Sequence, residues 1–202
     1  MCGRYQLVAN EDDIRIRFNV DIYEDIYRSS LNCAPTQQLP VILNTEPKKL
    51  SFLKWGLIPF WAKDQKIGSR LINARSETID SKPAFKHAFR KRRCLVVSSG
   101  FYEWKKEEKR KIPYRFFVRS EKLFSMAGIW EEWKDRHGKT IQSFSILTTS
   151  PNPLVEKIHN RMPVLLHPEE EQIWLKEENP AVLKNLLESF PAEEMEVEPA
   201  SL

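Results

Sequence analysis

The chain has 202 residues, of which 41% are hydrophobic and 30% charged. This length predicts one domain with a sizeable core, and six Trp and eleven Phe exclude a disordered chain. No apolar run is long enough to span a bilayer, and no leading segment indicates export. The three cysteines form no C-x-x-C pair, which argues against a disulfide scaffold and a zinc site, so we expect a cytoplasmic protein without metal or cofactor.

The net charge of +4 hides an asymmetry along the chain. Residues 167–202 hold ten Glu and two Lys, a net charge of −8, whereas the preceding residues hold 30 Lys and Arg against 18 Asp and Glu, a net charge of +12. A basic body favours polyanionic partners such as nucleic acid. An ordinary charged surface explains the composition at least as well, so charge alone leaves both interpretations open.

Local patterns in the first half of the chain predict few elements. Residues 11–18 alternate charged and apolar side chains, which is compatible with a helix or a strand. Strands are predicted at 39–43 and 50–55, with a turn at 44–47 between them. A helix is predicted at 81–90. Ser81 is expected to cap this helix, with Pro83 in its first turn and basic residues in its last.

The second half is rich in predicted strands, at 94–98, 112–118, 123–129, 141–148 and 164–166. Helices are predicted at 153–159, 168–176 and 180–189. Strands grouped in the middle with helices towards the ends favour an α+β fold over a doubly wound α/β fold. No repeat or Gly/Ser linker divides the chain, so we expect a single domain over 1–202.

Cys2 is the most informative residue. A small side chain at position 2 normally permits removal of Met1, and Cys2 would then carry an α-amine with a pKa of about 7.7–8.0 beside a thiol with a pKa of about 8.5. With one aldehyde, the amine gives an imine and the thiol closes a thiazolidine ring. Alternatively, the amine acts as the base for the thiol, as in N-terminal nucleophile hydrolases. A third possibility is that a cysteine follows Met1 by chance and has no catalytic role.

Three further blocks put polar residues in apolar or aromatic surroundings. Asn73 and Arg75 alternate along an extended segment, so they point to the same side. Glu103 stands between aromatics, where burial would raise its pKa towards neutrality and suit it to acid–base catalysis; a surface position on a half-exposed strand is the alternative. His159 is suited to shuttle protons, although a lone His is more often a structural hydrogen-bonding residue.

Aromatic and basic residues complete the candidate site. Trp55 and Trp61 flank a Gly/Pro-containing segment and either stack on bases or fill the core, which is what we expect of Trp55. Guanidinium groups match phosphate oxygens, and four arginines lie near the candidate catalytic residues in sequence: Arg4, Arg70, Arg75 and Arg161. The dense basic stretches 86–93 and 105–111 are interpreted mainly as solvated faces.

Six ordered blocks together resemble the SOS response-associated peptidase family, whose members crosslink to abasic (AP) sites in single-stranded DNA. The blocks are Met-Cys-Gly-Arg at 1–4, Asn-Cys-Ala-Pro-Thr at 32–36, Trp-Gly-Leu-Ile-Pro at 55–59 with Trp61, Asn-Ala-Arg-Ser-Glu at 73–77, Gly-Phe-Tyr-Glu-Trp at 100–104, and Ile-His-Asn-Arg-Met-Pro at 158–163. They lie within 1–166, and the acidic, helical segment 167–202 is less diagnostic.

The resemblance implies one compact α+β domain with a barrel-like, mostly antiparallel β-sheet core flanked by helices. It also implies four catalytic roles. Cys2 would join the open-chain deoxyribose aldehyde as a thiazolidine, and Asn73 would hold the sugar. Glu103 would transfer protons to and from the α-amine, and His159 would help to open the sugar ring.

The resemblance further implies the DNA contacts. Near the lesion these would be Arg4, Asn32, Arg75 and Arg161, while Trp61 and Pro40 would act as a wedge or stacking platform. Cys33 stands where we expect an aliphatic residue, a change of packing alone.

The sequence therefore predicts a monomeric enzyme that recognises AP sites in single-stranded DNA and shields them by a covalent link through Cys2. Autocatalytic removal of Met1 and an AP-lyase side activity accompany this prediction. The expected location is the cytoplasm, at the nucleoid when DNA is bound, with no membrane and no metal. Two alternatives remain, an N-terminal nucleophile peptidase or amidase and a non-catalytic single-stranded DNA-binding module.

Overall fold

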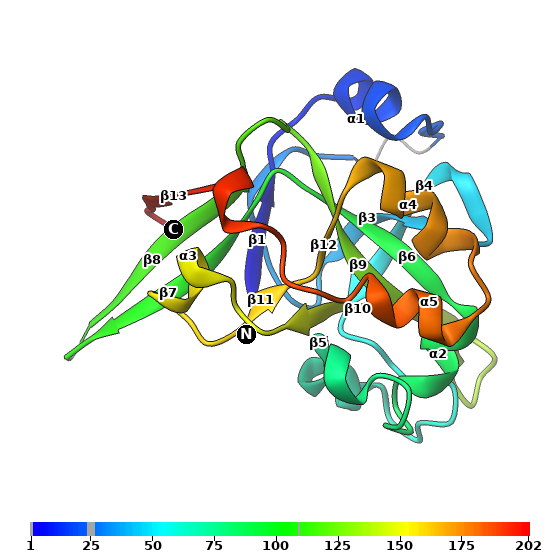
Figure 1. The fold of residues 1–202 in the computed structure, drawn as a ribbon. Helices are drawn as coiled ribbons and strands as arrows, with labels where there is room; N and C mark the ends of the chain where they lie inside the picture. The colour runs from blue at the N-terminus through cyan, green and yellow to red at the C-terminus, as the bar shows by residue number, and fades with distance from the viewer. Residues whose placement is uncertain (1, 24–26, 109) are drawn as a thin grey trace.

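Five strands between residues 38 and 149 close into a barrel (Figure 1). The computed structural model describes residues 2–23, 27–108 and 110–202. The strands, in barrel order, are β10 (Thr140–Thr149), β4 (Glu46–Trp55), β3 (Gln38–Leu43), β6 (Arg93–Ser98) and β9 (Phe124–Lys134), and β9 pairs with β10 again. These pairings are antiparallel except that of β4 with β10, in which Trp55 is aligned with Phe144.

A second sheet packs against the barrel. Its strands, in spatial order, are β13 (Met195–Pro199), β8 (Arg110–Val118), β7 (Gly100–Glu107), β1 (Arg4–Leu7) and β2 (Ser30–Cys33). The buried ring of Tyr5 in β1 lies 5.4 Å from that of Trp55 in β4, which joins the two sheets through one apolar core. The β7–β8 hairpin extends beyond the barrel (Figure 1).

Short elements complete the fold. The remaining strands β5 (Asn73–Arg75) and β11 (Met162–Pro163) pair with β10, and β12 (Leu165–Leu166) pairs with β9. The α-helices are α1 (Glu11–Phe18), α2 (Lys86–Lys91), α3 (Pro153–Glu156), α4 (Pro168–Lys176) and α5 (Pro180–Asn185). Short 3₁₀ segments are η1 (Gln65–Arg70), η2 (Ser76–Thr78) and η3 (Ala192–Glu194). None of the helices in these described ranges combines the length and apolar character needed to cross a bilayer.

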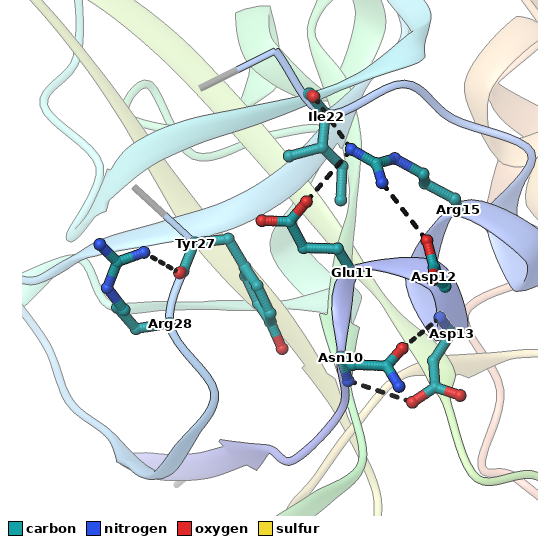
Figure 2. Close-up of polar contacts among 8 residues, drawn as sticks. All are labelled: Asn10, Glu11, Asp12, Asp13, Arg15, Ile22, Tyr27 and Arg28. Carbon is teal, nitrogen blue, oxygen red and sulfur yellow. Dashed lines mark hydrogen bonds and ion pairs between the residues drawn. The ribbon is translucent and has the colours of Figure 1, made fainter. Parts of the chain in front are cut away.

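The start of α1 is fixed by its cap (Figure 2). The Asn10 side chain accepts a hydrogen bond from the Asp13 N–H at 2.8 Å, and the Asp13 carboxylate accepts one from the Asn10 N–H at 3.1 Å. Arg15 pairs with Glu11 one turn earlier and also donates to the Ile22 carbonyl. The capping box therefore decides between the two structures that the alternating pattern permits, in favour of a helix.

The predicted fold class is confirmed, since the chain forms a mostly antiparallel barrel with flanking helices. The six predicted strands outside 164–166 are present, most with longer bounds than expected, and 164–166 contains only the short β12. Helices are present within 153–159, 168–176 and 180–189, the first and last of them shorter than predicted. The strands β1, β2, β7, β11 and β13 have no counterpart among the predicted strands, and β5 was predicted only as an extended segment.

The helix predicted at 81–90 is wrong in its first half. The helix α2 begins only at Lys86. Ser81 is not its N-cap, since its hydroxyl donates to the Thr78 carbonyl at 3.2 Å. Pro83 explains the delay, since a proline disfavours helical backbone in the residue before it. Residues 82–85 therefore form a turn instead.

Arg93 corrects the interpretation of 86–93 as a solvated face. Its side chain is 2% exposed and donates to five main-chain carbonyls, those of Phe89, Arg90, Trp174, Leu175 and Glu177. The first two carbonyls belong to the end of α2 and the others to the end of α4. Arg93 thus satisfies two helix C-termini at once and fixes α4 to the barrel.

We expect Arg93→Ala to lower the free energy of unfolding by about 3 kcal/mol, because buried carbonyls lose their donor. Urea denaturation measures this, and Arg90→Ala, at an exposed position three residues earlier, is the matched control. Equal stability of the two variants would contradict the role given to Arg93.

Candidate active site

The first strand brings Cys2 to Glu103. In the antiparallel pairing of β1 with β7, Arg4 is opposite Tyr102. Since paired strands run in opposite directions, Cys2, just before β1, falls beside the residues that follow Tyr102. Burial, and after it the charge of Glu103, raises the pKa of the Cys2 thiol, which is fully buried and contacts the Arg4 carbonyl at 3.6 Å. Met1 lies outside the described residues.

Glu103 is buried within β7, with 2% of its surface exposed. The alternative of a surface glutamate is therefore wrong. Burial raises the pKa of its carboxyl to about 7, because the charged form loses its hydration. Near neutral pH, Glu103 is consequently present in both protonated and ionised forms, as a group that accepts and returns protons must be.

His159 is held in one orientation by the loop after α3. The main-chain N–H of His159 donates to the Val155 carbonyl at 2.8 Å, and its ring Nδ1 accepts from the main-chain N–H of Arg161 at 3.1 Å. The proton of the neutral imidazole is thereby assigned to Nε2, which lies 3.7 Å from Glu103 Oε2. Burial also lowers the pKa of His159, which keeps the ring neutral near pH 7.

Asn73 occupies the first position of β5, where it is aligned with Ile146 of β10. The preceding carbonyl, of Ile72, accepts from the Trp55 indole at 2.9 Å and from the Ile146 N–H at 3.1 Å, so two hydrogen bonds fix the backbone just before Asn73. Both polar atoms of the Asn73 side chain are shielded from solvent and have no hydrogen-bond partner among the described residues. A buried amide without partners is costly, which makes Asn73 a candidate for binding a ligand.

A cleft of about 390 Å³ opens beside the pair of Glu103 and His159. Its other lining residues are Trp104, Lys106 and Lys111 of the β7–β8 hairpin. The cleft therefore combines two proton-transfer groups with a cationic wall. These lysines were expected only as part of a solvated face, and no local sequence signal indicates that the hairpin register turns them towards the site.

The predicted DNA-binding arginines fall into two groups. Arg161 is 14% exposed at its side chain, forms a two-point ion pair with Glu77 and donates to the Thr148 carbonyl at 2.6 Å. Its guanidinium thus fixes the His159 loop against β10 and η2. These contacts engage the group that was expected to contact DNA. Arg75, by contrast, is exposed, and Arg4 is partly exposed with its guanidinium donating to the Gly3 carbonyl.

Asn32, in β2, is also exposed. Pro40 does not fit its predicted stacking role, because it is buried in β3, opposite Phe52 of β4. The neighbouring turn contains another proline, Pro35, which is partly exposed. Pro35 lies within the motif block 32–36.

Trp61 is 49% exposed, whereas Trp55 is fully buried in the core as expected. Two hollows, of about 590 and 550 Å³, share the Trp61 side chain. Basic residues line the first, namely Lys63, Lys66 and Arg70, and the second is lined by Phe60, Pro83, Lys86 and His87. The indole thus presents ring surface beside both cationic and aromatic neighbours.

Within 2–23, 27–108 and 110–202, no group of three or more His, Cys, Asp or Glu side chains is arranged to hold a metal ion. The cysteines Cys2, Cys33 and Cys94 are all free and buried.

The chain is similar to known proteins over most of its length. The family model of the SOS response associated peptidase (SRAP) matches residues 1–202. The abasic site processing protein YoqW of Bacillus subtilis (strain 168) is 44% identical over 202 residues, covering 97% of this chain and 90% of its own. The abasic site processing protein HMCES of Xenopus tropicalis is 28% identical, covering 84% of this chain and 64% of its own.

The fold has close counterparts as well. A crystal structure of a protein from Bacteroides thetaiotaomicron superposes with a TM-score of 0.89 at 33% identity, covering 99% of this chain and 92% of that one. A second, from Bordetella bronchiseptica, has a TM-score of 0.87 at 23% identity and covers all of both chains. On the family match and the relatives together, the chain belongs to the SOS response-associated peptidase family.

Proposed function

We propose that this protein recognises AP sites in single-stranded DNA and links to them covalently through Cys2 after removal of Met1. The observation that carries the proposal is the grouping of three side chains: the buried thiol of Cys2, the carboxyl of Glu103 with a pKa of about 7, and the oriented imidazole of His159. The relatives named abasic site processing proteins support the same substrate.

The first step is the opening of the sugar. An AP site is mostly a closed hemiacetal, and its aldehyde forms when the O1′ hydroxyl loses a proton and O4′ gains one. The protonated carboxyl of Glu103 is suited to give a proton to O4′ and to take up the O1′ proton on its other oxygen. The Nε2–H of His159, whose proton is fixed there by the hydrogen bond at Nδ1, assists by donating a hydrogen bond to O4′. The unpartnered amide of Asn73 offers both a donor and an acceptor to the sugar.

The second step forms the imine. The α-amine of Cys2 must be unprotonated to attack C1′ of the aldehyde, and Glu103 accepts the proton. The resulting carbinolamine loses its hydroxyl as water, for which Glu103 returns a proton. A carboxyl with a pKa of about 7 is suited to both transfers, since neither form is strongly favoured at neutral pH.

The third step closes the ring. The Cys2 sulfur adds to the imine carbon while its proton passes to the nitrogen, which gives a thiazolidine without loss of any further group. Burial keeps the Cys2 thiol protonated, so this proton remains available. If closure fails, the imine allows β-elimination of the strand, which accounts for a lyase side activity.

The DNA is held by the exposed polar and aromatic residues around the site. Arg4, Arg75 and Asn32 are proposed to contact the strand near the lesion. Trp61 is proposed to stack on a base beside it, and Pro35 replaces Pro40 as the proline that assists. A single strand suits such a surface because no opposing base must be displaced. The protein is proposed to act as a monomer in the cytoplasm.

We expect Cys2→Ala to abolish the heat-stable adduct with AP-containing single-stranded DNA. The alanine amine still forms an imine, so borohydride should trap an adduct with this variant if it is folded and its Met1 is removed. Denaturing gels measure both products, and intact mass reports the loss of Met1. The control is Cys33→Ala, which also removes one buried cysteine and should crosslink like the unaltered protein.

A heat-stable adduct with Cys2→Ala would contradict the proposal. Turnover of amide substrates without DNA would favour a hydrolase instead.

We expect Glu103→Gln to slow crosslinking by about 100-fold or more, since general acid–base groups contribute about 10²–10⁴-fold. The rate of the unaltered protein should rise as pH increases through 7, as Glu103 ionises. In the variant, the rise should follow only the α-amine, at about pH 7.7–8.0. Single-turnover rates over a pH series test this, and identical profiles would count against Glu103.

The same substitution should stabilise the fold above neutral pH. Because the folded pKa of Glu103 is raised, the unfolded chain ionises first, and stability falls between about pH 4.5 and 7. Glu103→Gln should remove that loss and gain on the order of 3 kcal/mol at pH 8, measured by denaturation. A slow but more stable variant separates a catalytic role from a structural one.

We expect Trp61→Ala to weaken binding of intact single-stranded DNA by about 1–2 kcal/mol, the effect of losing one stacked base. Fluorescence anisotropy measures the affinity, and the melting temperature should stay unchanged because the side chain is half exposed. Tyr23→Ala, at an aromatic residue 72% exposed on another part of the surface, is the control. Equal affinities of the two variants would argue against stacking on Trp61.

A further inference from the structure

Two lysines of the β7–β8 hairpin face each other across the strands. The register aligns Lys106 with Lys111, and both side chains are exposed. Like charges directly opposite each other in an antiparallel pair are destabilising. Neither lysine forms an ion pair with any residue of the described chain, whereas the adjacent Lys105 pairs with Glu107 at 2.7 Å. The hairpin therefore holds two neighbouring ammonium groups without an internal counterion.

The same two lysines line the cleft that contains Glu103 and His159. Lys106 is within electrostatic reach of the imidazole, since its positive charge adds to the effect of burial in lowering the pKa of His159. The uncompensated charge is thus directed at the proposed reaction site. A ligand with negative charge close to the reacting sugar would relieve the repulsion between the lysines and fill the cationic side of the cleft.

We infer that Lys106 and Lys111 form a subsite for one backbone phosphate of the DNA, the phosphate directly next to the abasic sugar. The inference rests on the proposed function, because a sugar that lies between Cys2 and His159 carries its flanking phosphates into or beside this cleft. Opposed residues of an antiparallel pair have Cβ atoms about 4.5–5.5 Å apart, so two flexible ammonium groups can contact oxygens of one phosphate. The subsite would fix the position of the sugar as well as add affinity.

The test uses single-stranded DNA with a tetrahydrofuran analogue of the AP site, which binds but has no aldehyde. We expect the double variant Lys106→Gln/Lys111→Gln to bind it about tenfold more weakly than the unaltered protein. The slope of log affinity against log salt should become shallower by about 0.7, the value for one neutralised phosphate of a single strand. The control Lys105→Gln/Lys139→Gln removes the same charge at two lysines that do not line the cleft.

A neutral methylphosphonate at the phosphate 5′ or 3′ of the analogue identifies the contact. One of the two replacements should weaken binding to the unaltered protein and to the control variant but leave the Lys106→Gln/Lys111→Gln variant unaffected. If all three proteins lose the same affinity, or if the double variant binds like its control, the subsite is overturned. The proposed function fails separately, if the unaltered protein forms no adduct with reactive AP-containing DNA.

Discussion

The pairing of β1 with β7 is the constraint on which the site depends. It covers Glu103 with the start of the chain and brings Cys2 beside it, so one short strand accounts for both the buried carboxyl and the thiol next to it. Burying a carboxyl raises its pKa and costs folding free energy when it ionises. The fold thus retains, close to an imidazole and a thiol, a group that lowers its stability at neutral pH, which is the cost that the proposed proton transfer requires.

Strand β10 is the rigid part that positions the other half of the site. It pairs with β4 and β9 within the barrel, with β5 on one side and with β11 further along. Asn73 in β5 and the loop that carries His159 are therefore tied to the same strand. Arg161 adds a link between that loop, β10 and Glu77. A guanidinium expected to bind DNA thus acts in positioning, by fixing the backbone whose N–H orients the imidazole.

Sequence reasoning identified the strands of the barrel because apolar runs bounded by turn residues carry a local signal. It could not identify closure, since the parallel pairing of Lys54 with Ser143 joins residues far apart in the chain. The motif blocks named Cys2, Glu103 and His159, whose grouping the structure contains. The stacking role predicted for Pro40 conflicts with its burial, which depends on the tertiary fold and has no local sequence signal.

The charge asymmetry acquires a structural meaning from the ion pairs of the acidic segment. Glu171 pairs with Arg17, while Glu196 and Glu198 of β13 pair with Arg119 and Arg115 at the β8 edge of the second sheet. The negative charge of the C-terminal segment therefore neutralises, in part, basic residues that lie outside the cleft. Around the cleft, Lys106 and Lys111 keep their charge uncompensated within the described chain. A modest net charge is thus compatible with a local excess of positive charge beside Glu103 and His159, because the fold neutralises one part of the basic body and leaves another without counterions within the described chain.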